Sequence, residues 1–246
     1  LLAIAVEAGV KFLQAQTTGL DHVDVEGILG TGLLLAHAPG QLSSVAMAQS
    51  AMMFILMHAH GYNEARQNFD RGKMYFPTGT ELIGRTLGLI GFGASAQELA
   101  RRAKPFGLRI WSIDVRPIEK EILEEIEPDF LGGPDDLDRV VAESDYLSLH
   151  LHLTPQTRHT IDARRIELMK ESACLINVAR GELVDEQALY NALVNKRLGG
   201  AGLDVFTQEP PDPGLDVYQL PNVFTMPHPA GSTDGTSRKR AQFAAD

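Results

Sequence analysis

Cysteine and positive charge are scarce in this sequence of 246 residues. It contains one cysteine, Cys174, so a fold held together by internal disulfide bonds is excluded. Cys174 lies in the apolar run ACLINV, where we expect a buried core thiol rather than a nucleophile. Only 22 lysines and arginines oppose 32 aspartates and glutamates, giving a net charge of −10. This charge argues against nucleic acid as a partner, because binding to a phosphate backbone needs a basic surface.

Long hydrophobic runs are also missing. A membrane-spanning helix needs about 20 consecutive apolar residues. The most apolar stretch, residues 45–62, is interrupted by Gln49, Ser50, His58 and His60. The opening LLAIAVEAGV has no basic segment before an apolar one, so we expect no signal peptide. These absences favour a cytoplasmic protein without a membrane partner.

From residue 86 onward, short apolar runs alternate with amphipathic segments. This alternation is typical of an α/β domain, in which helices cover a parallel sheet. Helix signals occupy residues 95–107, 135–144, 162–170 and 185–200, the last with Asp185 as N-cap and Gly199 as terminator. We therefore predict a Rossmann-type, doubly wound parallel sheet with strands over residues 86–91, 108–114, 145–151, 173–178, 200–206 and 222–227.

The N-terminal part of the sequence has a different organisation. Two short strand-like runs, residues 12–16 and 33–36, flank a helical turn, and one long helix is expected over residues 43–66. We assign residues 1–42 to part of a second domain and residues 43–229 to the Rossmann domain.

A glycine-rich turn follows the first strand predicted for the sheet. The run LIGFGASAQELA gives Gly91-x-Gly93-x-x-Ala96 at the start of a helix. The first glycine permits the tight turn, the second lets the backbone approach a pyrophosphate, and the third position needs a small residue. The helix N-terminus adds N–H groups and a dipole that favours an anion. The alternative is a plain tight turn, but the spacing favours dinucleotide binding by Gly91, Phe92, Gly93, Ala94 and Ser95.

An acidic residue ends the next strand, as a dinucleotide site requires. Asp114 lies 23 residues after Gly91, close to the ~20 expected for the acid that binds a ribose. A carboxylate there accepts hydrogen bonds from the ribose and repels a 2′-phosphate, which favours NAD over NADP. Arg116 nearby weakens that preference.

Polar residues occur where the later strands end. Arg180 and Asp204 each follow an apolar run, Glu209 comes shortly afterwards, and His228 ends the last strand in TMPHPAG. Taken singly, these side chains could be a surface arginine, loop acids and a turn histidine. Ligands of open α/β sheets bind beyond the carboxyl ends of the strands, so we expect these side chains to meet in one crevice beside the dinucleotide.

These motifs, in this order, resemble the D-isomer-specific 2-hydroxyacid dehydrogenases. The similarity runs over nearly the whole sequence, through TTGLDHVDV, TGTELIGRTLGLIGFG, LHLTPQTRHTI, LINVARGELVDEQAL, GAGLDVFTQEP and NVFTMPHPAG. It implies a flavodoxin-like substrate domain built from both ends of the chain, with residues 230–246 starting the return into it. It also implies that this sequence is truncated at both ends.

The resemblance assigns roles to individual residues. It implies that Arg180, Glu209 and His228 are catalytic, and that Thr18, Gly19 and Arg180 bind the substrate. It further implies cofactor contacts from Thr154, Pro155, Val178, Ala179, Arg180, Asp204, His228, Ala230 and Gly231, beside the glycine turn and Asp114. A homodimer formed through residues 43–66 is also implied.

The implied reaction suits these residue types. A 2-oxo acid needs its carboxylate anchored and its carbonyl polarised, and the planar guanidinium of Arg180 can do both. A hydride moves between the nicotinamide and C2, while a residue that titrates near neutrality, His228, transfers the proton. Glu209, hydrogen-bonded to the other ring nitrogen, would fix the tautomer. Two alternatives on the same scaffold are a dinucleotide-sensing corepressor-like binding module and a phosphite dehydrogenase.

Several positions depart from the family pattern. Met47 replaces a usual glutamate, His60 stands where an arginine is common, and Pro229 replaces an aliphatic residue that would help to line the substrate pocket. His152 replaces a proline, and with His150 it gives two histidines on one strand face. No third ligand accompanies them, so we expect no metal site.

Overall fold

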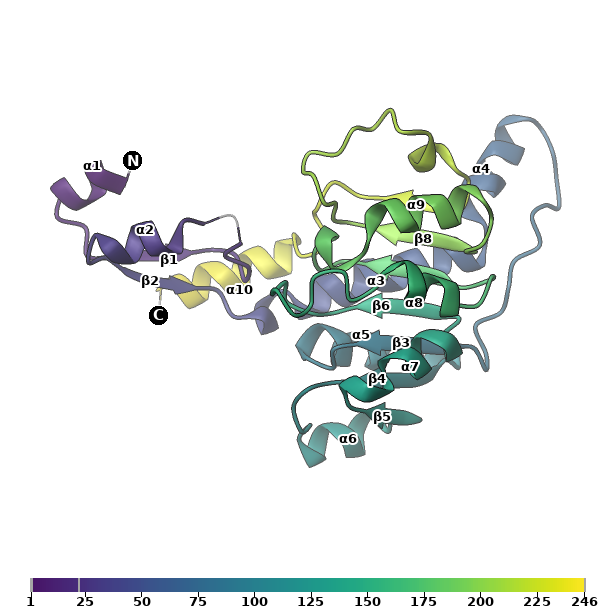
Figure 1. The fold of residues 1–246 in the computed structure, drawn as a ribbon, viewed down its shortest axis with the longest axis horizontal. Helices are drawn as coiled ribbons and strands as arrows, with labels where there is room; N and C mark the ends of the chain where they lie inside the picture. Colours follow the sequence, from purple (N-terminus) through teal and green to yellow (C-terminus); the bar gives the residue numbers. More distant parts are fainter. Residues whose placement is uncertain (1, 22, 246) are drawn as a thin grey trace.

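The computed structural model describes residues 2–21 and 23–245. Its centre is a parallel sheet of seven strands in the order β5-β4-β3-β6-β7-β8-β9 (Figure 1). The strands are β3 (Thr86–Ile90), β4 (Arg109–Ile113), β5 (Phe130–Gly132), β6 (Tyr146–Leu149), β7 (Cys174–Asn177), β8 (Gly200–Leu203) and β9 (Val223–Thr225). All six predicted strands are confirmed with shorter ends, and β5 is an additional edge strand.

The strand order places a topological switch between β3 and β6. The chain runs outward from β3 to β5 and then returns to pair β6 with the other side of β3. Loops at the carboxyl ends of β3 and β6 therefore lead in opposite directions, which opens a crevice at that edge. The glycine-rich turn follows β3 directly, so it lies at this switch point.

Helices cover both faces of the sheet and bury two apolar clusters. One face is covered by α3 (Ser44–Ala59), α5 (Ala94–Ala103) and α6 (Lys120–Ile126), whose side chains include the buried Phe54 and Leu99. The other face is covered by α7 (Leu137–Glu143), α8 (Ala163–Leu168) and α9 (Glu186–Val194), which bury Val140 and Leu189. Full burial of each large apolar side chain contributes roughly 1.5–3 kcal/mol. Cys174 lies in the first cluster, as expected of a core thiol.

Two predictions about helix ends are wrong. Residues 43–66 form two helices, because α3 ends at Ala59 and α4 (Tyr62–Asp70) begins after Gly61. Gly61 has a φ of +56°, a left-handed conformation that glycine adopts without a steric penalty, and this turns the chain between the helices. Helix α9 ends at Val194, well before Gly199, although the Asp185 carboxylate caps its start by accepting the Ala188 N–H at 3.0 Å.

The N-terminal region forms a separate small unit. It consists of α1 (Leu2–Glu7), β1 (Phe12–Ala15), α2 (Val25–Gly30) and β2 (Leu34–His37), and β1 pairs with β2 in parallel, apart from the large sheet (Figure 1). Helix α10 (Asp234–Ala245) packs against the 3-10 turn η1 (Gly40–Leu42) that follows β2. The other 3-10 turns are η2 (Lys104–Phe106), η3 (Pro134–Asp136), η4 (Gly181–Leu183) and η5 (Asp216–Gln219). No helix within the described ranges is long and apolar enough to cross a bilayer.

Candidate active site

A cavity of about 510 Å³ is lined by residues that follow the carboxyl ends of the sheet strands and by residues of the N-terminal unit. Many of the residues singled out in the sequence line it together: Thr18, Gly19, Gly93, Ala94, Ser95, Val178, Ala179, Arg180, Glu209, His228 and Gly231. The other predicted site residues do not line the cavity: Gly91, Phe92, Asp114, Thr154, Pro155, Asp204 and Ala230. The structure therefore brings Arg180, Glu209 and His228 together at one cavity, as expected, but Asp204, which was expected with them, does not line it.

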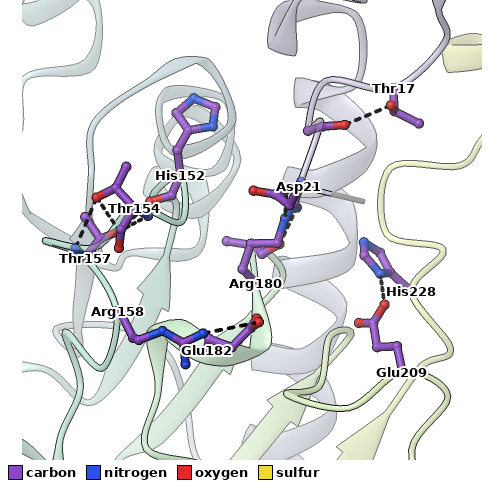
Figure 2. A network of polar contacts seen from close by, with 12 residues as sticks. Thr17, Asp21, His152, Thr154, Thr157, Arg158, Arg180, Glu182, Glu209 and His228 are labelled. Atoms are coloured by element: carbon purple, nitrogen blue, oxygen red, sulfur yellow. Dashed lines mark hydrogen bonds and ion pairs between the residues drawn. The ribbon is translucent and has the colours of Figure 1, made fainter. Parts of the chain in front are cut away.

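His228 and Glu209 form a hydrogen-bonded pair at one wall of the cavity (Figure 2). The His228 Nδ1 lies 2.8 Å from the Glu209 Oε2. The other carboxylate oxygen accepts the Phe206 N–H at 3.1 Å, so the glutamate is itself held in place. With Nδ1 engaged, Nε2 is the ring nitrogen left to exchange a proton. His228 has a φ of +61°, an uncommon conformation for a residue with a side chain and one that is often found at functional positions.

The loop that carries His228 is fixed by its neighbours. The Ala230 N–H donates to the Asp204 Oδ2 at 3.0 Å, and the Ser50 hydroxyl donates to the Ala230 carbonyl at 3.3 Å. Asp204 is fully buried directly after β8, so it connects the ends of β8 and β9. Burial raises the pKa of Asp204 to about 6, although the Ala230 N–H acts in the opposite direction.

Arg180 reaches the cavity from the end of β7. Its backbone carbonyl accepts a hydrogen bond from the Asn177 side chain at 2.8 Å. The guanidinium donates from Nε to the Asp21 carboxylate at 2.7 Å and from Nη1 to the Ala179 carbonyl at 2.6 Å (Figure 2). A Cβ atom on Gly19 would lie 1.5 Å from Nη2, so only a residue without a side chain can stand beside this guanidinium in its present position.

The glycine turn after β3 has the geometry that its pattern predicts. Gly91 has a φ of +89°, and a Cβ there would lie 2.8 Å from the His150 carbonyl oxygen, so a glycine is required. A Cβ on Gly93 would instead enter open space, its nearest neighbour being an Arg116 nitrogen 3.9 Å away. Gly93 precedes α5 and lines the cavity, so an anion can approach the backbone at this helix N-terminus.

Asp114 supports this turn from the end of β4. It accepts the Phe92 N–H at 2.8 Å and the backbone and side-chain N–H groups of Arg116 at 2.9 and 3.2 Å. Burial by itself raises the pKa of Asp114, but these hydrogen bonds outweigh it and hold the pKa below its usual value. The carboxylate is therefore charged at neutral pH, as binding of ribose hydroxyl groups requires.

The two histidines near β6 have different surroundings. His150 lies between the hydroxyl groups of Ser95, 2.9 Å from Nδ1, and Ser148, 3.0 Å from Nε2. Burial lowers the pKa of His150 to about 4, so this ring is neutral at physiological pH. His152 is exposed, and no cluster of three metal-binding side chains occurs among the residues that the structure describes.

Thr154 and Pro155 lie in an exposed turn beside the cavity rather than in its wall. The Thr154 N–H donates to the Thr157 hydroxyl at 2.8 Å, which closes the turn (Figure 2).

Comparison with known proteins supports the family resemblance that the sequence motifs indicate. Residues 52–230 match the model of the D-isomer specific 2-hydroxyacid dehydrogenase, NAD binding domain. The chain belongs to this family. It is 37% identical over 240 residues to the hydroxypyruvate reductase of Thermotoga maritima, covering 95% of this chain and 76% of that one. It is 36% identical over 239 residues to the D-3-phosphoglycerate dehydrogenase of Methanocaldococcus jannaschii, covering 96% of this chain but 44% of that one.

A solved structure of the family confirms the fold. The D-lactate dehydrogenase of Aquifex aeolicus, complexed with NAD and lactic acid, superposes with a TM-score of 0.83 at 28% identity. The match covers 95% of this chain and 74% of that one. This 2-hydroxyacid dehydrogenase chain is therefore a Rossmann-type α/β protein with a nicotinamide-cofactor domain.

Two features of the dehydrogenase chain fit a bound dinucleotide. Gly93 leaves open space beside the backbone at the N-terminus of α5. Asp204 Oδ1 is buried without a hydrogen-bond partner among the described residues. A buried acceptor without a donor is costly, and the carboxamide N–H group of a nicotinamide would supply one. The residues present therefore fit a nicotinamide dinucleotide.

Sequence reasoning missed several residues of the dehydrogenase cavity, among them Asp21 and Arg240. Asp21 lies two positions after Gly19 and forms the ion pair with Arg180, but its place in TTGLDHVDV carries no sign of an arginine across the cavity. Arg240 lines the cavity from α10. The surrounding SRKRAQF resembles an ordinary solvated basic segment, so only the three-dimensional contacts reveal its position.

Proposed function

We propose that the protein containing this chain is an NAD-dependent D-2-hydroxyacid dehydrogenase, which interconverts small 2-oxo acids and D-2-hydroxy acids. The observation that carries the proposal is the His228–Glu209 pair, which lines the same cavity as the Arg180 guanidinium beside the glycine turn. We further propose that residues 1–42 and 230–246 belong to the substrate domain and residues 43–229 to the NAD-binding domain. The separate β1-β2 sheet supports this division.

The proposed mechanism assigns one task to each side chain. NADH, when bound, supplies the hydride that C2 of the substrate receives. Arg180 anchors the substrate carboxylate and polarises the carbonyl, with the backbone at Thr18 and Gly19 on the other side. His228 donates a proton from Nε2 to the carbonyl oxygen, so a hydride and a proton together convert the ketone to an alcohol. Glu209 holds Nδ1 and stabilises the positive charge of the protonated ring.

The cofactor would be held by residues around the glycine turn. Ser95 and the backbone of Gly91, Phe92, Gly93 and Ala94 would contact the pyrophosphate, and Asp114 the ribose. Asp204 would accept from the carboxamide. The remaining proposed contacts come from residues that flank the cavity: Thr154, Pro155, Val178, Ala179, Ala230 and Gly231.

Steady-state assays on the full-length protein test this function. We expect NADH oxidation with at least one of glyoxylate, hydroxypyruvate, pyruvate and a branched 2-oxo acid, and a D configuration in the product. Because the charged Asp114 repels a 2′-phosphate, kcat/KM for NADH should exceed that for NADPH by about 10-fold or more. Absence of turnover across the panel would refute the proposal. NAD-dependent oxidation of phosphite would instead support the alternative of a phosphite dehydrogenase. Cell fractionation would test the proposed cytoplasmic location.

We also propose a homodimer. Exposed apolar side chains gather in α4 and the segment after it: Tyr62, Phe69, Met74, Tyr75 and Phe76. Only Tyr62 lies within the region first predicted as one helix over residues 43–66, and the other four follow that region. Half of the residues of α3 are buried, so α3 itself offers less apolar surface to a partner. Light scattering after gel filtration should give twice the subunit mass, and Phe69→Glu should shift the protein toward the monomer. A monomeric wild-type protein at micromolar concentration would contradict this.

A further inference from the structure

The cavity contains a second guanidinium that the proposed mechanism does not use. Arg240 lies in α10 and lines the same cavity as Arg180 and His228. Its Nε is buried without a hydrogen-bond partner, and its side chain forms no ion pair with any residue that the structure describes. Burial lowers the pKa of Arg240, but an arginine keeps its charge at physiological pH.

The acidic side chains of the cavity already have partners. Asp21 pairs with Arg180 at 2.7 Å, and Glu209 with His228 at 2.8 Å. Glu182 lies 3.9 Å from the guanidinium of Arg158, which approaches it from outside the cavity (Figure 2). Within the described lining, no acidic side chain therefore neutralises Arg240. A buried donor and a charge without partners are both costly, so an anionic ligand group would stabilise this site.

A second polar group without a partner belongs to a residue that lines the same cavity. The Thr18 hydroxyl oxygen is buried and has no hydrogen-bond partner among the described residues. The methyl group of Thr18 lies 3.6 Å from the Cβ position of Gly40, in the η1 turn against which α10 packs. The uncharged Ser43 and Met47 also line the cavity. A hydroxyl and a guanidinium are suitable donors for the oxygens of a carboxylate or phosphate.

We propose that Arg240 is a specificity-determining residue, and that the preferred substrates are 2-oxo acids whose side chain ends in a second anionic group. This inference rests on the proposed function, in which Arg180 binds the carboxylate next to the reacting carbon. Arg240, assisted by the Thr18 hydroxyl, then binds the carboxylate or phosphate at the far end of the substrate. The cavity volume of about 510 Å³ is within the usual range of small-molecule sites.

Matched substrate pairs in the full-length protein test this inference. Oxaloacetate is compared with 2-oxobutyrate, 2-oxoglutarate with 2-oxopentanoate, and 3-phosphohydroxypyruvate with hydroxypyruvate. In one or more pairs, the wild-type protein should have at least a ~10-fold higher kcat/KM for the substrate with the anionic side chain. The reason is that hydrogen bonds to a charged group are stronger than those between neutral groups. The pair with the largest ratio identifies the second group as a carboxylate or a phosphate.

Variants then assign the preference to Arg240. Arg240→Met should lower kcat/KM by about 10- to 100-fold for the substrate with the anionic side chain, and by much less for the substrate with the uncharged side chain. The ratio of the two kcat/KM values should therefore fall toward one. Arg240→Lys should retain part of the preference, and the KM for NADH should not change. Arg238→Met is the matched control, because Arg238 is exposed on the same helix and pairs with Asp234 at 2.5 Å. Equal losses for both members of a pair in Arg240→Met would overturn the inference.

A binding measurement separates this inference from the proposed function. Calorimetry on the NADH-loaded protein compares succinate with butyrate, which have the same chain length but differ by one carboxylate. Tighter binding of succinate by the wild-type protein, but not by Arg240→Met, would support the second anion site even without turnover. Equal affinities in the wild-type protein would overturn it. Turnover of 2-oxo acids with no preference for those that have an anionic side chain would overturn this inference alone. Inactivity with every 2-oxo acid would instead refute the proposed function.

Discussion

His228→Gln should lower kcat for 2-oxo acid reduction by about 10²–10⁴-fold, the usual contribution of a positioned general acid. Glutamine can keep a hydrogen bond with Glu209, which lies 2.8 Å from the His228 ring, but its amide cannot deliver a proton at neutral pH. The affinity for NADH should change by less than about threefold, because the variant removes the proton donor and leaves the main cofactor contacts in place. Single-turnover kinetics and NADH fluorescence titration would measure the two quantities.

His159→Gln provides the control for this variant. His159 is also an exposed histidine with a positive φ, +51°, but it lies outside the cavity. Its backbone N–H, which donates to the Glu182 carbonyl at 2.8 Å, is unaffected by the side-chain change. Its kcat should remain near the wild-type value. If His228→Gln lost kcat and NADH affinity in equal proportion, the acid role would be contradicted and His228 would be a cofactor contact.

The large sheet could be predicted because its strands are buried on both faces. Runs such as residues 86–91 and 173–178 are continuously apolar, which distinguishes them from the amphipathic helices between them. The three-residue strand Phe130–Gly132 could not be found in this way, since so short an edge strand has no periodicity of its own. The break at Gly61 was missed because residues that favour helix continue on both sides of it. The left-handed turn is a property of one glycine rather than of the pattern.

The site was predictable where residues follow strand ends and was not where distant segments meet. Arg180 and His228 follow β7 and β9, and parallel strands bring their carboxyl ends to one edge. Asp21 and Arg240 approach from the N-terminal unit and from α10, and no spacing relates these segments to the sheet. The single hydrogen bond from Ala230 to Asp204 shows the same limit. The motif identifies Asp204, but only the structure shows that it holds the histidine loop.

Arg180→Lys should lower kcat/KM for 2-oxo acids by about 10²–10³-fold, although the charge is conserved. The guanidinium spreads its donors over three nitrogens: Nε is taken by Asp21 at 2.7 Å, Nη1 by the Ala179 carbonyl at 2.6 Å, and Nη2 lies beside Gly19. A lysine has one nitrogen, so it cannot hold Asp21 and Ala179 and still present a planar pair of donors to a carboxylate. The lost interaction acts on both the substrate and the developing oxyanion, so kcat should fall and KM should rise. Arg158→Lys is the matched control, since Arg158 is exposed and lies 3.9 Å from Glu182 outside the cavity. If Arg180→Lys retained more than about a third of the wild-type kcat/KM, the positive charge alone would suffice, and the planar fork of donors would have no role in the reaction.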